Sequence, residues 1–209
     1  GGVSLKTRIM DRVPFSTSIL CFLTVVTSMC VAYLVSGNVF GSIKITDLES
    51  YGGFTSEHIK NFELWRLFVA QIIHSKQLHM VYNVLALLAL GFLLEKRIGY
   101  LWFVSTWFVS GALGTLYSTL FVVAPWNIGT GGSQAIFGLC GLGFVLLHKF
   151  ESKLLLTIGL FFAIFPALAL DLIFAGYPKP GHMCGFTIGL LMGLVFMVSR
   201  KGKEIKLIG

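Results

Sequence analysis

Charged residues are scarce in this chain: Asp, Glu, Lys and Arg make up 12% of its 209 residues. Soluble domains carry about 25%. Hydrophobic residues account for 56%, and the mean hydropathy is +0.84. So little charge excludes an ordinary soluble domain. We predict an all-α integral membrane protein whose core is one bundle of spanning helices.

Cysteine and acidic residues are also few. Cys21, Cys30, Cys140 and Cys184 all fall inside apolar segments, without a CxxC pair or a Cys/His cluster at metal-ligand spacing. We therefore expect neither a disulfide framework nor a metal or other cofactor. The 16 Lys and Arg outnumber nine Asp and Glu, but they gather at the ends of apolar segments. That placement is typical of membrane topology, so a lipid bilayer is expected around the chain and no nucleic-acid partner.

Six apolar segments approach the roughly 20 residues that a spanning helix needs. They cover 15–35, 78–94, 100–123, 133–147, 154–175 and 182–198. We accordingly predict a six-helix membrane domain over 15–198, an N-terminal segment over 1–14 and a basic tail over 199–209. The fourth segment is short, so its first residue, Ser133, is expected below the membrane surface and in reach of water.

The distribution of Lys and Arg predicts the orientation, because the side richer in them faces the cytoplasm. Eleven lie on the side of the termini: Lys6, Arg8, Arg12, Lys96, Arg97, Lys149, Lys153, Arg200, Lys201, Lys203 and Lys206. Both termini are therefore expected to be cytoplasmic and the 36–77 connection extracytoplasmic. That connection is rich in aromatic residues, so we expect short helices at the membrane interface, anchored by Trp65 and Arg66.

Two groups able to do chemistry begin two of the predicted helices from the extracytoplasmic side. Ser133 starts the fourth helix after Gly131 and Gly132, and His182 starts the sixth. Serine is a weak nucleophile at neutral pH and needs a base within hydrogen-bond reach. We predict a Ser133–His182 dyad, and we assign Asp171 to the top of the fifth helix and not to a triad.

A row of glycines provides a way for these two helices to meet, because small residues let membrane helices approach closely. On the sixth helix the glycines recur every four residues: Gly181, Gly185, Gly189 and Gly193. The fourth helix offers Gly138 and Gly141 in return.

Hydrolysis by a serine also needs hydrogen-bond donors for the oxyanion. His79 and Asn83 are four residues apart, so they share one face of the second helix, and both side chains can donate. Gly131 and Gly132 can free the backbone so that the Ser133 N–H joins them.

The other polar residues of the chain receive structural interpretations. We interpret His74 as a residue that bonds the loop before the second helix or hydrates the site. His58 and His148 are interpreted as solvated. Glu95 is interpreted as part of an ordinary charged helix end.

Taken in order, these residues resemble the rhomboid family of intramembrane serine proteases over about 62–193. The likeness rests on Trp65-Arg66, His79-Met80-Val81-Tyr82-Asn83 (HxxxN), Glu95-Lys96-Arg97-Ile98-Gly99, Gly131-Gly132-Ser133 (GxS), and His182 with Gly185 and Gly189 (HxxGxxxG). The resemblance implies that Ser133 is the nucleophile and His182 the general base. It further implies an oxyanion hole of His79, Asn83 and the Ser133 N–H, with Phe137 packed on the His182 ring.

The activity implied by this resemblance is cleavage of transmembrane segments in client membrane proteins, with water as the second substrate. A bacterial inner membrane or a eukaryotic secretory-pathway membrane would be its location. One position departs from the family pattern: Gln134 stands where a glycine usually follows the serine, which affects oxyanion-hole shape and substrate preference. Two alternatives stay open: a weak or inactive rhomboid-like protein that binds transmembrane clients, and a small transporter or channel.

Overall fold

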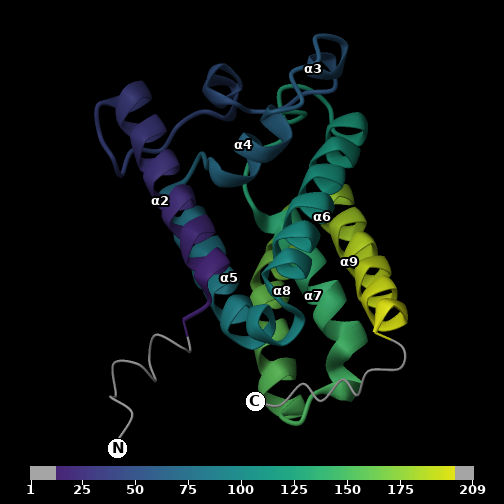
Figure 1. Cartoon of the computed structure of the whole chain (residues 1–209). Coiled ribbons are helices and arrows are strands. Elements are labelled where there is room, and N and C mark those ends of the chain that lie inside the picture. The colour runs from purple at the N-terminus through teal and green to yellow at the C-terminus, as the bar shows by residue number, and fades with distance from the viewer. Residues whose placement is uncertain (1–12, 201–209) are drawn as a thin grey trace, which may run out of the picture.

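The computed structural model describes residues 13–200, which are helical over most of their length (Figure 1). Within this part of the chain, the bundle consists of α2 (Phe15–Ser36), α5 (Gln77–Ile98), α6 (Tyr100–Phe121), α7 (Ser133–Leu146), α8 (Lys153–Ala175) and α9 (Pro180–Ser199). These helices match the six predicted segments to within a few residues. The predicted terminal segments, 1–14 and 199–209, lie almost wholly outside the described residues.

Four of these helices, α2, α5, α8 and α9, are long and apolar enough to cross a membrane. This is what an integral membrane protein requires. The helix α6 is also 22 residues long but contains several Ser and Thr residues, and α7 has only 14 residues. The count of six spans therefore stays a prediction.

The short helix α7 forms the centre of the bundle, with 12 of its 14 residues buried. It packs against α9, α6, α8 and α5. Its contact with α9 is backbone to backbone: a Cβ atom added to Gly189 would lie 1.8 Å from the carbonyl oxygen of Gly138, and one added to Gly185 would lie 2.3 Å from that of Gln134. The predicted glycine row thus lies in the α7–α9 interface, where larger residues would force the helices apart.

The connection between α2 and α5 folds at one end of the bundle, opposite the end where α2 begins and α9 ends (Figure 1). We call these the loop end and the terminal end. The connection contains three short helices: η1 (Ile45–Tyr51), α3 (Glu57–Lys60) and α4 (Arg66–Ile72). The Arg66 guanidinium ties α4 to η1 and the turn after it by donating to the carbonyls of Glu49 and Gly53. Phe54 and Gly129 exchange two backbone hydrogen bonds, which tie the connection to the segment leading to Ser133.

The structure contradicts the interpretation of Glu95 as part of an ordinary charged helix end. Its side chain is buried and accepts hydrogen bonds from the backbone N–H groups of Ser16 and Thr17, both at 2.8 Å, and from the Thr17 hydroxyl at 2.6 Å. A carboxylate is favoured there because the N-terminus of α2 carries unpaired N–H groups and the positive end of the helix dipole. The partner is 78 residues away in sequence, which is why local patterns do not reveal it.

His58 was also expected to be solvated, and this expectation is wrong. The residue is buried, and its Nδ1 accepts the backbone N–H of Thr55 at 3.0 Å. The turn into α3 therefore uses this imidazole as a local acceptor. His148 is exposed, as predicted.

Pro166 lies inside α8 and frees a carbonyl group that a side chain of α5 then binds. Proline has no N–H, so the carbonyl of Phe162, four residues earlier, lacks its helical partner. The hydroxyl of Tyr82 lies 2.8 Å from this oxygen and 2.9 Å from that of Ala163. This contact holds α5, with His79 and Asn83 on it, in register against α8.

Candidate active site

Ser133 and His182 are brought together by the close packing of α7 and α9. Ser133 is the first residue of α7, and His182 lies in the first turn of α9. The Ser133 Oγ to His182 Nε2 distance is 2.8 Å. Both side chains are buried, so bulk water does not compete for this hydrogen bond.

Asp171 contacts this pair from the end of α8, although it was not predicted to be the third member of a triad. Its Oδ2 is 2.6 Å from His182 Nδ1 and accepts the backbone N–H of Lys179 at 2.9 Å. The carboxylate is only 2% exposed. The helix α8 ends at its C-cap Gly176, which has a left-handed conformation. The turn that follows reverses the chain into α9, so two residues eleven positions apart face each other. A carboxylate near the end of an apolar helix, shortly before a histidine that begins the next, was the signal available in the sequence.

These contacts define where the hydrogens lie. An ionised carboxylate only accepts, so Nδ1 of His182 must carry a hydrogen and donate it to Asp171. The other ring nitrogen, Nε2, then has a free lone pair and accepts the Ser133 hydroxyl. Serine, imidazole and carboxylate in this order form the arrangement in which a base activates a nucleophile and is itself oriented by a third group.

Phe137 holds the plane of the His182 ring. It lies one turn after Ser133 on α7, and the two rings are stacked with centroids 4.4 Å apart and an interplanar angle of 6°. Stacking against a buried phenyl ring restricts rotation of the imidazole, which keeps Nε2 directed at the serine hydroxyl.

The start of α7 presents backbone donors beside Ser133. Gly131 has φ +87°, a left-handed conformation that favours glycine, and this turns the chain sharply into the helix. The first hydrogen bond within α7 joins the N–H of Ile136 to the carbonyl of Gly132. The N–H groups of Ser133, Gln134 and Ala135 precede it and have no acceptor within the helix, so this end attracts negative charge.

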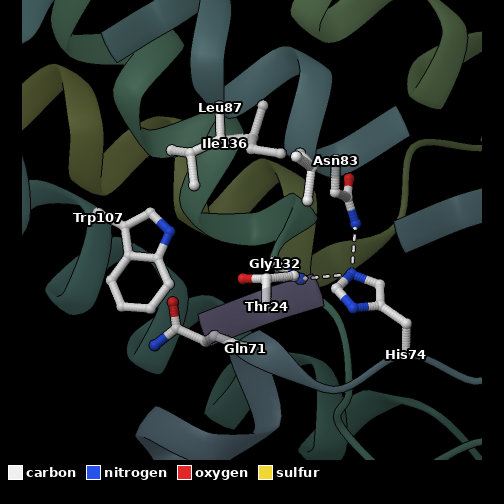
Figure 2. A pocket seen from close by; sticks show the side chains of 9 residues that line it. Thr24, Gln71, His74, Asn83, Leu87, Trp107, Gly132 and Ile136 are labelled. Atoms are coloured by element: carbon white, nitrogen blue, oxygen red, sulfur yellow. Dashed lines mark hydrogen bonds between the residues drawn. The ribbon is translucent and has the colours of Figure 1, made fainter. Parts of the chain in front are cut away.

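His74 links α5 to the turn before Ser133 (Figure 2). Its Nε2 lies 2.8 Å from Nδ2 of Asn83 and 3.4 Å from the backbone nitrogen of Gly132. Both are donors, so Nε2 accepts and Nδ1 carries the ring hydrogen. Nδ1 lies 3.1 Å from Oγ of Ser28, which donates to the carbonyl of Ile72. His74 is thus a neutral structural residue at the site, and one N–H of Asn83 is engaged by it while the second is not.

A small cavity of about 10 Å³ lies behind this network, with room for about one water molecule (Figure 2). Gln71, Asn83 and Trp107 line it. Gln71 Oε1 and Asn83 Oδ1 are buried and accept no hydrogen bond from the described part of the chain. His79 lies outside the cavity on the exposed side of α5, with its ring centroid 5.9 Å from that of His74.

The network predicts a pH dependence of stability. Burial, with a smaller contribution from the charge of His79, lowers the pKa of His74 from 6.5 to about 3. As pH falls below 6.5 the unfolded chain takes up a proton at this residue and the folded chain does not. The contribution of neutral His74 to the free energy of unfolding is therefore fully present above pH 6.5 and is lost as the pH falls toward 3. The free energy of unfolding then falls by at most about 1.4 kcal/mol per pH unit, as expected for one proton.

The variant His74→Gln isolates this contribution, because a glutamine amide can accept from Asn83 and donate to Ser28 without titrating. Unfolding in detergent is measured at a series of pH values between about 5 and 7.5. We expect wild type to lose stability more steeply than the variant as pH is lowered. Equal slopes for the two proteins would show that His74 does not stay neutral in the folded state.

The Gln134 side chain packs against two glycines, Gly114 and Gly181. A Cβ atom added to Gly114 would lie 2.8 Å from Gln134 Cβ, and one added to Gly181 would lie 3.2 Å from Gln134 Cγ. The side chain is buried, and its Oε1 lies 3.3 Å from Ser133 Oγ. The glutamine therefore fits between α6, α7 and α9 without displacing Ser133 from His182.

Serine, histidine and aspartate are thus joined by hydrogen bonds inside a bundle of apolar helices. Residues 61–199 match the Rhomboid domain. The chain belongs to the rhomboid family.

Similar proteins occur in plants and parasites. The chain is 33% identical to RHOMBOID-like protein 1 of Arabidopsis thaliana over 156 residues, which are 72% of this chain and 39% of that protein. It is 38% identical to Rhomboid-like protease 3 of Toxoplasma gondii over 81 residues, 39% of this chain and 30% of that one. Inactive RHOMBOID-like protein 8 of Arabidopsis thaliana is 32% identical over 123 residues, 56% of this chain and 34% of that protein. The matches thus span well under half the length of these relatives.

Proposed function

We propose that this protein is an intramembrane serine endopeptidase that cleaves transmembrane segments of other membrane proteins. The observation that carries the proposal is the 2.8 Å hydrogen bond between Ser133 Oγ and His182 Nε2, buried in the bundle. A pair at this distance lets proton transfer accompany attack by the hydroxyl. The names of relatives such as the Toxoplasma gondii proteases agree with this activity.

In the proposed reaction, Ser133 Oγ attacks the carbonyl carbon of the scissile peptide while His182 Nε2 takes the hydroxyl proton. Asp171 orients the imidazole and stabilises its positive charge. The tetrahedral oxyanion would be stabilised by the Ser133 N–H, the second N–H of Asn83 and the ring N–H of His79. His182 then protonates the leaving amine, which leaves an acyl ester on Ser133.

Water completes the cycle by hydrolysing this ester, with His182 again acting as the base. The cavity beside Asn83 has room for about one molecule, and Gln71, His74 and Asn83 interrupt its mostly apolar lining, so it would hold water close to the site. A peptide bond in a helix has its carbonyl hydrogen-bonded and shielded. The substrate helix must therefore unwind locally before Ser133 can reach the carbonyl.

The proposed topology has six membrane spans, both termini in the cytoplasm and the loop end outside it. The excess of Lys and Arg on the side of the termini supports this orientation. Cleavage would then occur near the extracytoplasmic end of the client segment. A bacterial inner membrane or a eukaryotic secretory-pathway membrane is proposed as the location.

A fluorophosphonate probe tests the proposed chemistry directly, because it reacts with a serine only when a base activates that serine. The purified full chain is incubated with the probe in detergent, and the modified residue is identified by peptide mass spectrometry. We expect one adduct, on Ser133. A folded wild-type protein that stays unlabelled, or is labelled elsewhere, would contradict the proposal.

A second candidate is a weak or inactive rhomboid-like protein that binds transmembrane clients. Gln134 favours it, because it stands where the family pattern has glycine, and one relative is named inactive. The two candidates separate in a cleavage assay with a purified transmembrane substrate in liposomes. Binding of the substrate without cleavage or probe labelling would favour the second.

Two substitutions at Gln134 are expected to have different effects on the cleavage rate. Gln134→Gly restores the family residue and removes a long hydrogen bond and a buried side chain, but it leaves Ser133 and His182 in place, so we expect cleavage within a few-fold of wild type. Gln134→Glu places a carboxylate beside Ser133 that competes with His182 for the hydroxyl. We expect kcat to fall at least about tenfold, since hydrogen bonds to charged groups are worth roughly 1.5–3 kcal/mol. An inactive Gln134→Gly, or a fully active Gln134→Glu, would contradict this role.

A further inference from the structure

An apolar groove opens on the side of the bundle, away from Ser133. α8 packs on α5 and α7, and α9 packs on α6 and α7, so α7 forms the floor between two walls. The groove has a volume of about 250 Å³. Its floor and walls include Cys140, Phe144, Leu160, Phe161, Ile164 and Phe186.

The lining of the groove is apolar, so it favours a hydrocarbon chain over a polar ligand. Among the residues that line the groove, all within the described part of the chain, Thr157 is the only one with a hydroxyl, amide or charge. Its hydroxyl is already satisfied by donating to the carbonyl of Lys153 at 2.8 Å. A polar ligand would lose its hydration in the groove without gaining partners.

One end of the groove, which we call its mouth, lies near the terminal end of the bundle, beside two lysines. Leu147 lines the groove and begins η2 (Leu147–Lys149), which ends at the exposed Lys149. Lys153, also exposed, begins α8 one turn before Thr157. Glu151 lies between the two lysines, so this turn holds two cations and one anion.

The groove also runs in the direction that a lipid chain takes. It extends from Leu147 and Thr157 at the mouth to Ile164 on α8 and Phe186 on α9, toward the middle of the bundle. Thr157 and Ile164 are seven positions apart on α8, which corresponds to a rise of roughly 10 Å, about a third of the hydrocarbon thickness of a bilayer. A phosphate at the lysines and an acyl chain along the groove would therefore match both ends of one lipid.

We propose that this groove is a binding site for one anionic glycerophospholipid of the leaflet at the terminal end. Its acyl chain would lie on α7 between α8 and α9, and its phosphate would lie between Lys149 and Lys153. The groove and the lysines are separate from Ser133 and His182, so the proposal stands whether or not the protein cleaves peptides.

Native mass spectrometry of the full chain tests the site. The protein is loaded in detergent with dioleoyl phosphatidylglycerol or dioleoyl phosphatidylcholine and then washed. We expect one phosphatidylglycerol to stay bound to wild type, and phosphatidylcholine to be removed. The variant Thr157→Trp fills the mouth and should lose the bound lipid. Its control, Ile158→Trp, adds the same ring at an exposed neighbour that does not line the groove and should keep it.

The lysines are tested by Lys149→Gln and Lys153→Gln, singly and together. Each should weaken phosphatidylglycerol retention about fivefold, as expected for one basic side chain at an anionic headgroup. Lys44→Gln with Lys60→Gln, at the loop end, is the matched control and should have no effect. Equal retention of the two lipids, or full retention in Thr157→Trp, would overturn the proposal. So would a second copy of the chain in the groove, seen as a dimer that Thr157→Trp abolishes.

Discussion

Replacing Ser133 or His182 by alanine is expected to lower the cleavage rate by about 10⁴- to 10⁶-fold, and the double variant should be no slower than either single one. The reason is that the hydroxyl and the imidazole act as one unit across a 2.8 Å hydrogen bond, so the loss of either removes the whole activated nucleophile. Initial rates on a fluorogenic transmembrane substrate in proteoliposomes measure this, with the amount of folded enzyme determined by size-exclusion chromatography.

A buried serine elsewhere in the bundle provides the control. The hydroxyl of Ser110, in α6, donates to the carbonyl of Thr106 within the same helix. Ser110→Ala removes a hydroxyl of similar burial and should leave the rate within a few-fold of wild type. The dyad would be wrong if Ser133→Ala still cleaved at a rate close to that of Ser110→Ala. It would also be wrong if the losses from the two single substitutions multiplied in the double variant.

Asp171→Asn is expected to lower kcat by roughly 10²- to 10⁴-fold and to leave KM nearly unchanged. The asparagine amide is neutral, so it no longer stabilises the imidazolium that forms during attack. If its NH₂ group turns toward His182, the ring hydrogen moves to Nε2 and the serine loses its base. The rate of fluorophosphonate labelling at Ser133 should fall in parallel, because it depends on the same activation.

Lys179→Gln separates this effect from a general disturbance of the turn between α8 and α9. The Lys179 side chain is 59% exposed and its Nζ lies 3.6 Å from Asp171 Oδ1, whereas its backbone N–H bond to the carboxylate would stay intact. Because the Lys179 ammonium is largely solvated, its attraction to the carboxylate is screened and contributes about 1 kcal/mol or less, so the rate should change less than about fivefold. A purely structural role for Asp171 would instead give the two variants equal kcat at different unfolding temperatures.

The helices were predictable because their cause is local. Each long apolar segment must form its own backbone hydrogen bonds in a membrane, so length and composition locate it without knowledge of its neighbours. The predicted helix starting at Ser133 begins at that residue, and the predicted glycine row of α9 lies against α7. The resemblance to rhomboids rests on the same short-range signals, and the match to residues 61–199 agrees with it.

The contacts of Glu95, Asp171 and Gln134 were not predictable in this way, because each depends on which helix lies opposite. Glu95 caps a helix 78 residues away, and Asp171 meets His182 only because the short turn after α8 brings the start of α9 next to the end of α8. Gln134 stands where a glycine was expected, and two glycines on α6 and α9 make the space for it. The lengths of the apolar segments and the short motifs thus predict the family, the helices and the candidate reactive residues. Their partners are set by three-dimensional packing, since a buried polar group bonds to whatever lies nearest in space.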